Sequence, residues 1–327
     1  MNPARGRFTD YRPARVTVAV LVHIPHLAGY FEQRLDVLKV CLGSILEHTD
    51  QPYDLLVFNN GSCEEVCAYL DGMRQSGEIR YLLSSGVNLG KIGAFQILFR
   101  AAPGEVVAYS DDDIYHYPGW LSAHLEILDT FPNVGVVSGC AVRSLFEEER
   151  ISSNLRFAER EPGVVLKRGR FIPQEWIEDW AESYGREMAM VEKETAGLED
   201  MILEYRGVQA YAMANHNQFV TPKDVITRCL PESWSGRLMG EMNELDIRVN
   251  RAGFLRLTTI HRTTQHMGNR LNPKYSTQFT PDTRRISEAD SGPGLRKRVA
   301  RRFLLARPVR WFLLGIYSRL FRLLNPD

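Results

Sequence analysis

The stretch Gly104-Glu-Val-Val-Ala-Tyr-Ser-Asp-Asp-Asp113 decides the fold of this chain. Its apolar run, Glu105–Tyr109, has the length and composition of a buried strand. Three consecutive carboxylates follow, and neighbouring negative charges repel one another unless a cation neutralises them. Carboxylate oxygens suit Mg²⁺ and Mn²⁺, which also hold the phosphates of nucleotides. The stretch therefore predicts a strand that ends at a divalent-metal site, and a solvated acidic turn or a helix N-cap is the alternative.

The chain on both sides of this stretch alternates between strand and helix patterns from residue 16 to residue 138. Strands are expected at Val16–Val22, Asp54–Phe58, Ile79–Leu83, Glu105–Tyr109 and Val134–Ser138, and helices at Gln33–Glu47, Glu64–Gln75, Gly90–Ala101 and Pro118–Thr130. The alternation predicts an α/β fold with a single, mostly parallel, Rossmann-like sheet and helices on both faces. Ligands of such sheets bind beyond the carboxyl ends of the strands, where the aspartates and the turn Asn59-Asn-Gly-Ser62 are expected.

The second half has a weaker pattern. From residue 143 to about residue 204 the chain is rich in Glu and Arg, and we expect an insertion or a mobile acceptor-side region there. Order returns with the apolar runs Gly207–Met213 and Asn217–Thr221. A helix is expected over Leu238–Ala252, with Gly253 as its C-terminal cap.

Composition and charge exclude several classes of protein. The 327 residues, 44% hydrophobic and 24% charged, are typical of a soluble globular chain of one or two domains, not of a disordered, collagenous or multispanning protein. The 40 basic and 40 acidic residues balance, but residues 295–327 carry nine basic and one acidic side chain. An acidic body with a basic tail suggests a tail that contacts an anionic surface, and it argues against a nucleic-acid-binding protein.

Cysteine usage and the amino terminus indicate the compartment. The five cysteines, Cys41, Cys63, Cys67, Cys140 and Cys229, are scattered without zinc-site spacing, as expected for reduced thiols in the cytosol. The apolar run Val16–Val22 is too short for a signal peptide, and no small-residue cleavage site follows it. We therefore expect a cytoplasmic protein.

Three spaced motifs together resemble one family. The turn Asn88-Leu-Gly-Lys-Ile-Gly-Ala94, the strand with its aspartates at 104–113 and the helix start Pro118-Gly-Trp-Leu121 resemble the nucleotide-sugar glycosyltransferases of family 2, which have the GT-A fold. The segment Asp54-Leu-Leu-Val-Phe-Asn-Asn-Gly-Ser62 is similar to the second strand of that family. The resemblance covers residues 15–140 closely and residues 205–268 in outline.

The resemblance implies a metal site. Asp111 and Asp113 would bind a Mn²⁺ or Mg²⁺ ion that bridges the diphosphate of the sugar nucleotide, and Asp112 would lie near the ribose or the sugar. His266 resembles a late histidine that completes the metal site in some members, and imidazole is compatible with Mn²⁺ beside carboxylates. A purely structural histidine is the alternative, and His261 is a nearby competitor.

The resemblance also implies contacts to the nucleotide of a UDP-, GDP- or dTDP-sugar. Asn59 stands where the family usually has an aspartate that contacts the base, so it keeps hydrogen bonding without the charge. Lys91 lies at the turn where a basic residue approaches the nucleotide, and a solvent-facing lysine at a helix start is equally expected there. Pro25 is retained after the first strand, but the Thr-Tyr-Asn that usually follows is not.

The second half is expected to supply the catalytic base. The segment Glu241-Met-Asn-Glu-Leu-Asp-Ile-Arg-Val-Asn-Arg-Ala-Gly-Phe254 is similar to the acidic helix of the family, with Glu244 at the catalytic position and Asn243 where the first acid often stands. A carboxylate must take the proton of the acceptor hydroxyl within hydrogen-bond reach. Glu244 is the first candidate and Asp246 the second, and surface charges on an amphipathic helix are the alternative.

The tail has the composition of a membrane-surface helix. Residues 295–308 are rich in arginine, and residues 309–324 are strongly apolar but contain Arg310 and are interrupted by Arg319 and Arg322. This run is too short and too charged to span a bilayer. An amphipathic helix on an anionic membrane surface fits better, which places the protein at the inner face of the membrane. Packing on the body, or dimerisation, is the alternative.

These expectations give a complete hypothesis. The chain would be a divalent-metal-dependent, inverting glycosyltransferase acting on a sugar or lipid-linked acceptor, in the synthesis of cell-envelope polysaccharide or glycolipid. It would divide into an N-terminal extension (1–14), a donor-binding half (15–142), an insertion or acceptor-side region (143–204), an acceptor-binding and catalytic half (205–275), a linker (276–294) and a membrane-associating tail (295–327).

Other functions fit the sequence less well. A nucleotidyltransferase needs a glycine-rich basic loop after its first strand, and a dehydrogenase needs G-x-G-x-x-G there; the sequence has neither motif at that place. A degenerate homologue that serves as a membrane-docked scaffold is the non-enzymatic alternative, and the departures at Asn59 and Asn243 support it. The intact run of aspartates opposes it.

Overall fold

The computed structural model describes residues 9–143, 146, 148–231, 236–238 and 242–271, all of which belong to the compact unit Met1–Phe279. The linker at 276–294 and the tail at 295–327 lie outside the described residues. Among the helices that the structure describes, none combines the length and the apolar character needed to cross a bilayer.

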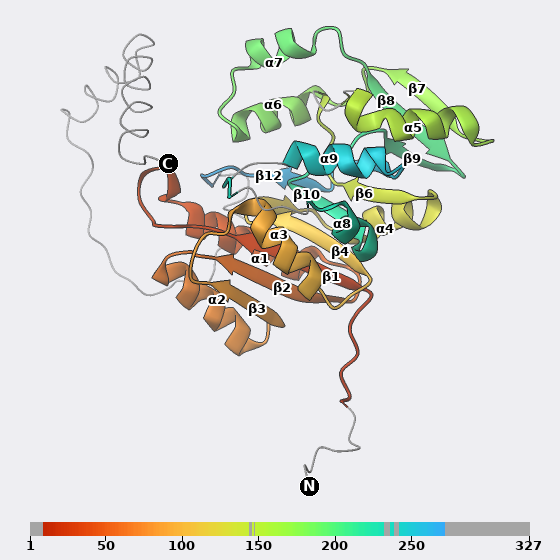
Figure 1. Ribbon diagram of the computed structural model, residues 1–327. Coiled ribbons are helices and arrows are strands. Elements are labelled where there is room, and N and C mark those ends of the chain that lie inside the picture. Colours follow the sequence, from red (N-terminus) through yellow and green to blue (C-terminus); the bar gives the residue numbers. More distant parts are fainter. Residues whose placement is uncertain (1–8, 144–145, 147, 232–235, 239–241, 272–327) are drawn as a thin grey trace, which may run out of the picture. The chain divides into compact units, whose positions relative to one another are not determined.

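A ten-stranded sheet forms the centre of the unit, in the order β3-β2-β1-β4-β10-β6-β11-β9-β8-β7 (Figure 1). Its strands are β1 (Val16–Val22), β2 (Tyr53–Asn60), β3 (Tyr81–Ser85), β4 (Val106–Asp111), β6 (Val134–Ser138), β7 (Val165–Gly169), β8 (Asp200–Tyr205), β9 (Val208–Tyr211), β10 (Gln218–Pro222) and β11 (Leu255–Thr259). The strands β5 (Ile114–His116) and β12 (Thr264–His266) form a small second sheet.

The strands β3, β2, β1 and β4 run parallel, as the sequence predicted. In the register, Val22 lies opposite Asn59 and Leu21 lies opposite Asp111. The carboxyl ends of β1, β2 and β4 therefore meet at one edge, where parallel sheets bind ligands. From β10 onward the sheet is mixed, because β10 pairs antiparallel with both β4 and β6.

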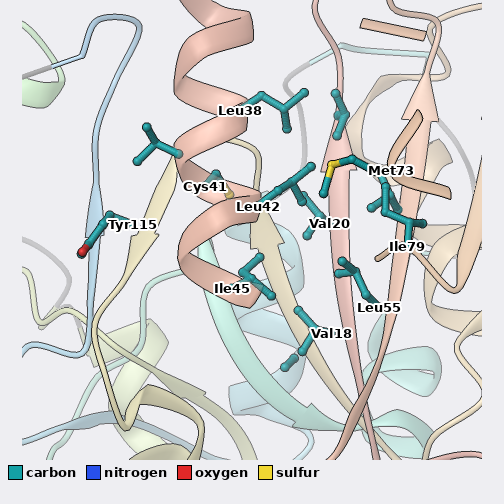
Figure 2. Packing of buried hydrophobic residues seen from close by; sticks show 14 of the residues in the cluster. Val18, Val20, Leu38, Cys41, Leu42, Ile45, Leu55, Met73, Ile79 and Tyr115 are labelled. Carbon is teal, nitrogen blue, oxygen red and sulfur yellow. The ribbon is translucent and has the colours of Figure 1, made fainter. Parts of the chain in front are cut away.

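Helices cover both faces of the sheet, which confirms the expected α/β architecture of the GT-A type. One face packs against α1 (Arg34–His48), α2 (Glu64–Ser76) and the start of α4 (Trp120–Thr130). The other packs against α3 (Gly90–Ala101), α8 (Lys223–Cys229) and α9 (Met242–Arg251). Figure 2 shows the first of these layers, where Leu38, Leu42 and Ile45 of α1 point toward β1. Their alternation with polar residues at helical spacing is the pattern that predicted α1.

The described residues of the segment 143–204, for which the sequence predicted an insertion or a mobile acceptor-side region, form regular elements, and an acceptor-side role for the segment stays a prediction. The segment forms α5 (Glu148–Arg160), β7, α6 (Gln174–Ser183), α7 (Met188–Thr195) and β8. Strands β7 and β8 pair antiparallel and extend the central sheet, so that β7 is its edge strand. A buried ion pair, with 2.7 Å between Arg143 Nε and Asp200 Oδ1, fixes the start of the segment to β8. The short, charged strand β7 shows no apolar alternation, which is why the sequence pattern missed it.

Element bounds agree closely in the remaining regions. The strands β1 and β6 and the helix α3 have the predicted ends, whereas β3 begins two residues later than expected. The helix predicted from Leu238 is described as α9 from Met242; Leu238 itself lies in a turn, and residues 239–241 lie outside the described residues. Gly253 follows α9 with a φ of 85°, the left-handed conformation expected of a C-terminal glycine cap.

Candidate active site

A cleft of about 580 Å³ lies beyond the carboxyl ends of β1 and β4. The parallel half contributes Lys91, Asp111 and Asp113 to its wall. The second half contributes residues from four separate segments, which are Ser183–Gly185, His216–Asn217, Met242–Asn243, and His266 with Gly268 and Asn269. Three residues predicted to bind metal, Asp111, Asp113 and His266, thus face one cavity. The size is that of a typical small-molecule site.

Asp111 ends β4 and is held by Lys91 of α3. The Lys91 ammonium nitrogen lies 2.8 Å from each oxygen of the carboxylate, and the Tyr109 hydroxyl also donates to Asp111. Burial, followed by the nearby Asp111 charge, raises the pKa of Tyr109 well above its usual value, so this hydroxyl stays a donor. The Lys91 side chain is only 8% exposed. It is therefore not the solvent-facing lysine that the sequence left open, and it neutralises one carboxylate of the cleft.

Asp112 points away from the cleft, toward α1. Its carboxylate is buried against the Arg34 guanidinium, and the backbone N–H of His23 donates to it over 3.4 Å. Burial, with added repulsion from Asp113 and Asp111, raises the pKa of Asp112 to about 6 despite the Arg34 charge. Asp112 is not part of the cleft wall among the described residues, and its predicted contact with the ribose or sugar stays a prediction.

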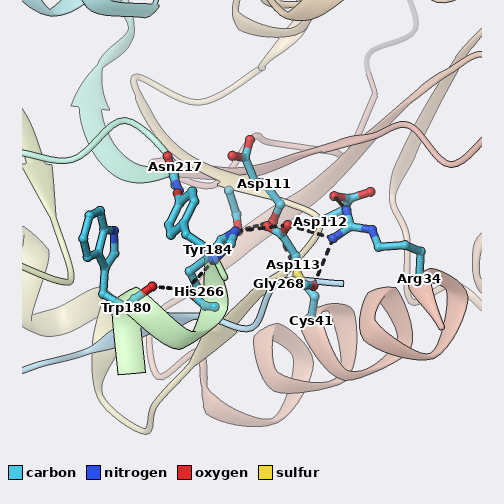
Figure 3. A network of polar contacts seen from close by, with 12 residues as sticks. Arg34, Cys41, Asp111, Asp112, Asp113, Trp180, Tyr184, Asn217, His266 and Gly268 are labelled. Carbon is cyan, nitrogen blue, oxygen red and sulfur yellow. Dashed lines mark hydrogen bonds and ion pairs between the residues drawn. The ribbon is translucent and has the colours of Figure 1, made fainter. Parts of the chain in front are cut away.

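Asp113 joins the two halves of the site (Figure 3). Its Oδ2 lies 2.7 Å from Arg34 Nη1 and 3.3 Å from His266 Nε2. Burial alone would raise the pKa of Asp113, but the His266 and Arg34 interactions outweigh it and hold the pKa below the usual value. Its other oxygen, Oδ1, is buried and has no hydrogen-bond partner among the described residues. A buried, charged oxygen without a partner is unfavourable unless a cation or a donor reaches it.

His266 is fixed by the segment that connects α6 to α7. The Tyr184 ring stacks on the imidazole at 4.4 Å between centroids and 13° between planes, and Ser183 Oγ lies 2.9 Å from His266 Nδ1. The connection packs so closely that a Cβ atom on Gly268 would lie 2.6 Å from the Ser183 carbonyl oxygen. These contacts turn His266 Nε2 toward Asp113. Sequence reasoning missed Ser183 and Tyr184, since neither stands in a motif.

The donor atoms fit a metal shared with a phosphate ligand. Within the described ranges, no group of three His, Cys, Asp or Glu side chains is placed to hold a metal ion by itself. Asp113, with its unsatisfied oxygen, and His266 nevertheless offer two ligands on one wall, and Asp111 lies on the same wall. Mg²⁺ is commonly bound by one or two carboxylates together with substrate phosphates and water. The residues present therefore fit a divalent ion that also binds a diphosphate.

The predicted base-binding residues, Asn59 and Pro25, have other surroundings in the structure. Asn59 uses its side chain inside its own turn, where Oδ1 accepts from the Ser62 N–H over 3.1 Å and Nδ2 lies 3.1 Å from Cys67 Sγ. Pro25 is exposed in the loop after β1. Neither residue lines the cleft in the described part of the chain, and their contact with a nucleobase stays a prediction.

Asn60 has an organising role that the sequence analysis did not assign. Its Oδ1 accepts from the Leu89 N–H over 2.9 Å, and its Nδ2 donates to Asn88 Oδ1 over 2.9 Å. Its carbonyl oxygen lies 2.9 Å from Nδ1 of His23, whose pKa is lowered mainly by burial. This asparagine therefore ties the ends of β1 and β2 to the start of α3, which carries Lys91. The motif Asn59-Asn-Gly-Ser62 was the available signal.

The two candidate bases have different surroundings. Glu244, in the first turn of α9, has a side chain that is 54% exposed and lies 3.8 Å from Arg248. It does not line the cleft among the described residues, whereas its neighbour Asn243 does. Asp246 is buried on the other side of α9, 2.7 Å from Arg256 and 3.0 Å from His216. The structure thus brings neither carboxylate to the aspartates of β4, and the roles of both stay predictions.

Comparison with known proteins gives the family. The model of glycosyl transferase family 2 matches residues 30–192, which include the aspartates of β4 and the segment that stacks on His266. No curated protein matches the chain significantly.

Similar solved structures include S. aureus TarS in complex with UDP-GlcNAc (15% identity, TM-score 0.32, covering 41% of this chain and 39% of that one). The mannosyltransferase PcManGT from Pyrobaculum calidifontis, with GDP-Man and Mn²⁺, is 26% identical, with a TM-score of 0.30 over 41% of this chain and 37% of that one. GalNAc-T7, with UDP, GalNAc and Mn²⁺, is 14% identical, with a TM-score of 0.48 over 78% of this chain and 43% of that one. The matched part thus spans about two fifths of each of these proteins. Through the domain at residues 30–192, the chain belongs to glycosyl transferase family 2.

Proposed function

We propose that the protein transfers a sugar from a nucleotide-sugar donor to an acceptor hydroxyl with the help of a divalent metal ion. The observation that carries this proposal is the convergence of Asp111, Asp113 and His266 on one cleft, with both aspartates inside the region that matches family 2. The cleft has the volume of a small-molecule site, and its wall offers oxygen and imidazole ligands on one side. These are the groups that a metal–diphosphate complex needs.

The roles of the residues follow from their contacts. Asp113 and His266 would hold the ion, with Mn²⁺ or Mg²⁺ as the candidates, and Asp111 with its Lys91 partner would border the donor. When bound, the ion would neutralise the charge that develops on the departing nucleoside diphosphate. Lys91 adds a positive charge at the same wall, in a buried position where electrostatic interactions are stronger than in water. The donor is a UDP-, GDP- or dTDP-sugar.

The acceptor is proposed from the tail. A basic, apolar segment at residues 295–327 supports binding to an anionic membrane surface, which suits a lipid-linked or glycolipid acceptor in envelope polysaccharide synthesis. Inversion of configuration at the anomeric carbon is part of this proposal. A single displacement assisted by one base inverts that carbon and needs no covalent sugar–enzyme intermediate. The donor half at 15–142 and the acceptor half at 205–275 would face each other across the cleft.

The first test measures donor binding. Titration calorimetry of the full chain with UDP, GDP, dTDP, UDP-GlcNAc and GDP-mannose, each with and without Mn²⁺, should give metal-dependent binding of one nucleotide class. Asp113→Asn should weaken that binding by about 100-fold or more, since even a residue behind a metal ligand typically contributes 10- to 100-fold. Asp36→Asn is the matched control, because Asp36 is an exposed carboxylate paired with Lys39.

The outcomes separate the two leading functions. Unchanged metal-dependent binding by Asp113→Asn would refute the metal assignment. Absence of binding by the unmodified protein to every nucleotide, in the presence of Mn²⁺ and of Mg²⁺, would refute the transferase and favour the degenerate scaffold.

A further inference from the structure

His216 lies on the cleft wall in the connection between β9 and β10. Its Nδ1 lies 3.0 Å from Asp246 Oδ2, and its side chain is 24% exposed, as expected for a ring with one edge toward an open cavity. The sequence analysis gave His216 no role, because it stands in no family motif. A histidine that faces a ligand cavity and is oriented by a carboxylate is a general arrangement for proton transfer.

Asp246 is held firmly as the partner of this histidine. Arg256, whose side chain is fully buried, places Nη2 2.7 Å from Asp246 Oδ1, and Arg150 lies 3.5 Å from Oδ2. Burial alone would raise the pKa of Asp246, but Arg256, His216 and Arg150 together keep it below the usual value. The carboxylate is therefore ionised at neutral pH and can only accept hydrogen bonds.

This arrangement fixes the tautomer of His216. Since Asp246 accepts, Nδ1 of His216 must carry the hydrogen, and in the neutral ring Nε2 then carries the lone pair. Within the ranges that the structure describes, Nε2 makes no hydrogen bond. The other charged or titratable groups of the described cleft wall are Tyr30, Lys91, Asp111, Asp113, Tyr184 and His266. A second neutral base of this kind does not occur there, because His266 is engaged by Asp113 and Ser183.

We propose that His216 is the general base of the transfer reaction and that Asp246 is its positioning residue. The inference rests on the proposed function. The acceptor oxygen forms a bond to the anomeric carbon, the bond from that carbon to the diphosphate oxygen breaks, and the nucleoside diphosphate leaves with the electron pair. The acceptor proton passes to Nε2 of His216 and then to solvent. Glu244, which is exposed and paired with Arg248, is not needed for this step.

The test separates binding from turnover and needs no known acceptor. Water serves as the acceptor, and the release of UDP or GDP from UDP-GlcNAc and GDP-mannose is measured with Mn²⁺ at a saturating donor concentration. The variants are His216→Ala and Glu244→Gln. His261→Ala is the matched control, because His261 is an exposed histidine that is not among the cleft residues. Donor affinity is measured by calorimetry for each protein.

His216→Ala is expected to lower turnover by about 100- to 10,000-fold, the usual contribution of a general base, with donor affinity changed less than about threefold. Added imidazole should restore part of the activity by occupying the space left by the ring. His261→Ala should keep turnover within about threefold of the unmodified protein, and Glu244→Gln, at the base that the family resemblance predicted, should lower turnover far less than His216→Ala does. Full turnover in His216→Ala, or a loss confined to Glu244→Gln, would overturn the inference without touching the proposed function. Absence of donor binding by the unmodified protein would instead refute the function itself.

Asp246→Asn tests the positioning role. It should lower turnover at unchanged donor affinity in the fraction that is folded, because the His216 ring loses its fixed tautomer. A purely structural aspartate would lower the folded fraction, with normal turnover in what remains, and that result would overturn the positioning role. If this variant does not fold, the imidazole rescue of His216→Ala still decides between a base and a structural histidine: failure to rescue would count against the base.

Discussion

The two sides of the cleft are assembled in opposite ways. On the parallel side, three neighbouring residues at the end of one strand, Asp111–Asp113, supply the carboxylates, and Arg34 and Lys91 from the helices that flank the sheet neutralise them. On the mixed side, the cleft residues come from four segments between Ser183 and Asn269. The first side can therefore be identified from one short stretch of sequence, whereas the second exists only once the sheet from β10 to β7 has formed.

Arg34 contacts both sides of the cleft, so its substitution is the strongest test of this comparison. Its guanidinium binds Asp112 and Asp113 and donates to the Gly268 carbonyl oxygen of the mixed side over 3.2 Å. Arg34→Met should lower the free energy of unfolding by about 3–5 kcal/mol, because it leaves Asp112 buried without its cation. Urea denaturation would measure the change.

Arg15→Met is the control for this prediction. Arg15 forms an ion pair with Asp129 whose side chains are about half exposed, 49% and 51%, so its loss should cost at most about 1 kcal/mol. If both variants lowered the free energy of unfolding by the same amount, burial would not make the Arg34 ion pairs more stabilising than the exposed Arg15 pair. The two sides of the cleft would then differ only in how close together their residues lie in the sequence.

Tyr184 tests how strongly the mixed side shapes the predicted metal site. Tyr184→Ala removes the ring that stacks on His266 and should weaken Mn²⁺-dependent nucleotide binding by about 10-fold, as is usual when the support of a metal ligand is lost. Calorimetry with the nucleotide bound by the unmodified protein measures this change.

Tyr184→Phe keeps the stack and loses only the hydroxyl that contacts Asn217, so its effect should be smaller. An equal loss in both variants would assign the effect to the hydroxyl. No loss in either would confine the donor site to the parallel side.

The smallest expected effect concerns pH and the parallel side. Burial, chiefly, lowers the pKa of His116 to about 3 and that of His124 to about 4. Both rings are therefore neutral in the folded protein. The stabilisation of the folded state that follows from their lowered pKa values is present above the ordinary histidine pKa of about 6.5 and is lost as the pH falls below it. Between pH 7.5 and 6.0 the free energy of unfolding should fall by about 1 kcal/mol.

Urea denaturation at several pH values in this range would measure the loss. Protonation of Asp112, whose pKa is raised to about 6, acts in the opposite direction, so the Asp112→Asn variant should show a steeper fall. A free energy of unfolding that rose as the pH fell would contradict the neutral state of the two histidines.

The sequence predicted the parallel half well because its signals are local. Apolar runs with polar turns predicted β1 and β6 to the residue, and the register of parallel strands then placed Asp111 beside the end of β1. The convergence of Asp111, Asp113 and His266 on one cleft was also predicted, although only the resemblance to family 2 pointed to His266. The burial of Lys91 was left open, since helix-start lysines are found both in solvent and in sites.

The rest depended on contacts over long distances in the chain. Ser183 and Tyr184 support His266 from 82 or more residues away, and His216 meets Asp246 across 30 residues. No periodicity encodes such contacts. The charged strand β7 was missed for a related reason: its pairing with β8, and not its own apolar character, makes it a strand.

That same strand has a consequence for how the molecule behaves in concentrated solution. β7 is an edge of the ten-stranded sheet, and an open edge can pair with a strand of another molecule and start aggregation. It is only five residues long and exposes Lys167 and Arg168. An incoming strand would have to dehydrate these positive charges and would gain few backbone hydrogen bonds in return. The extension that completes the cleft thus ends in a strand that discourages further growth of the sheet.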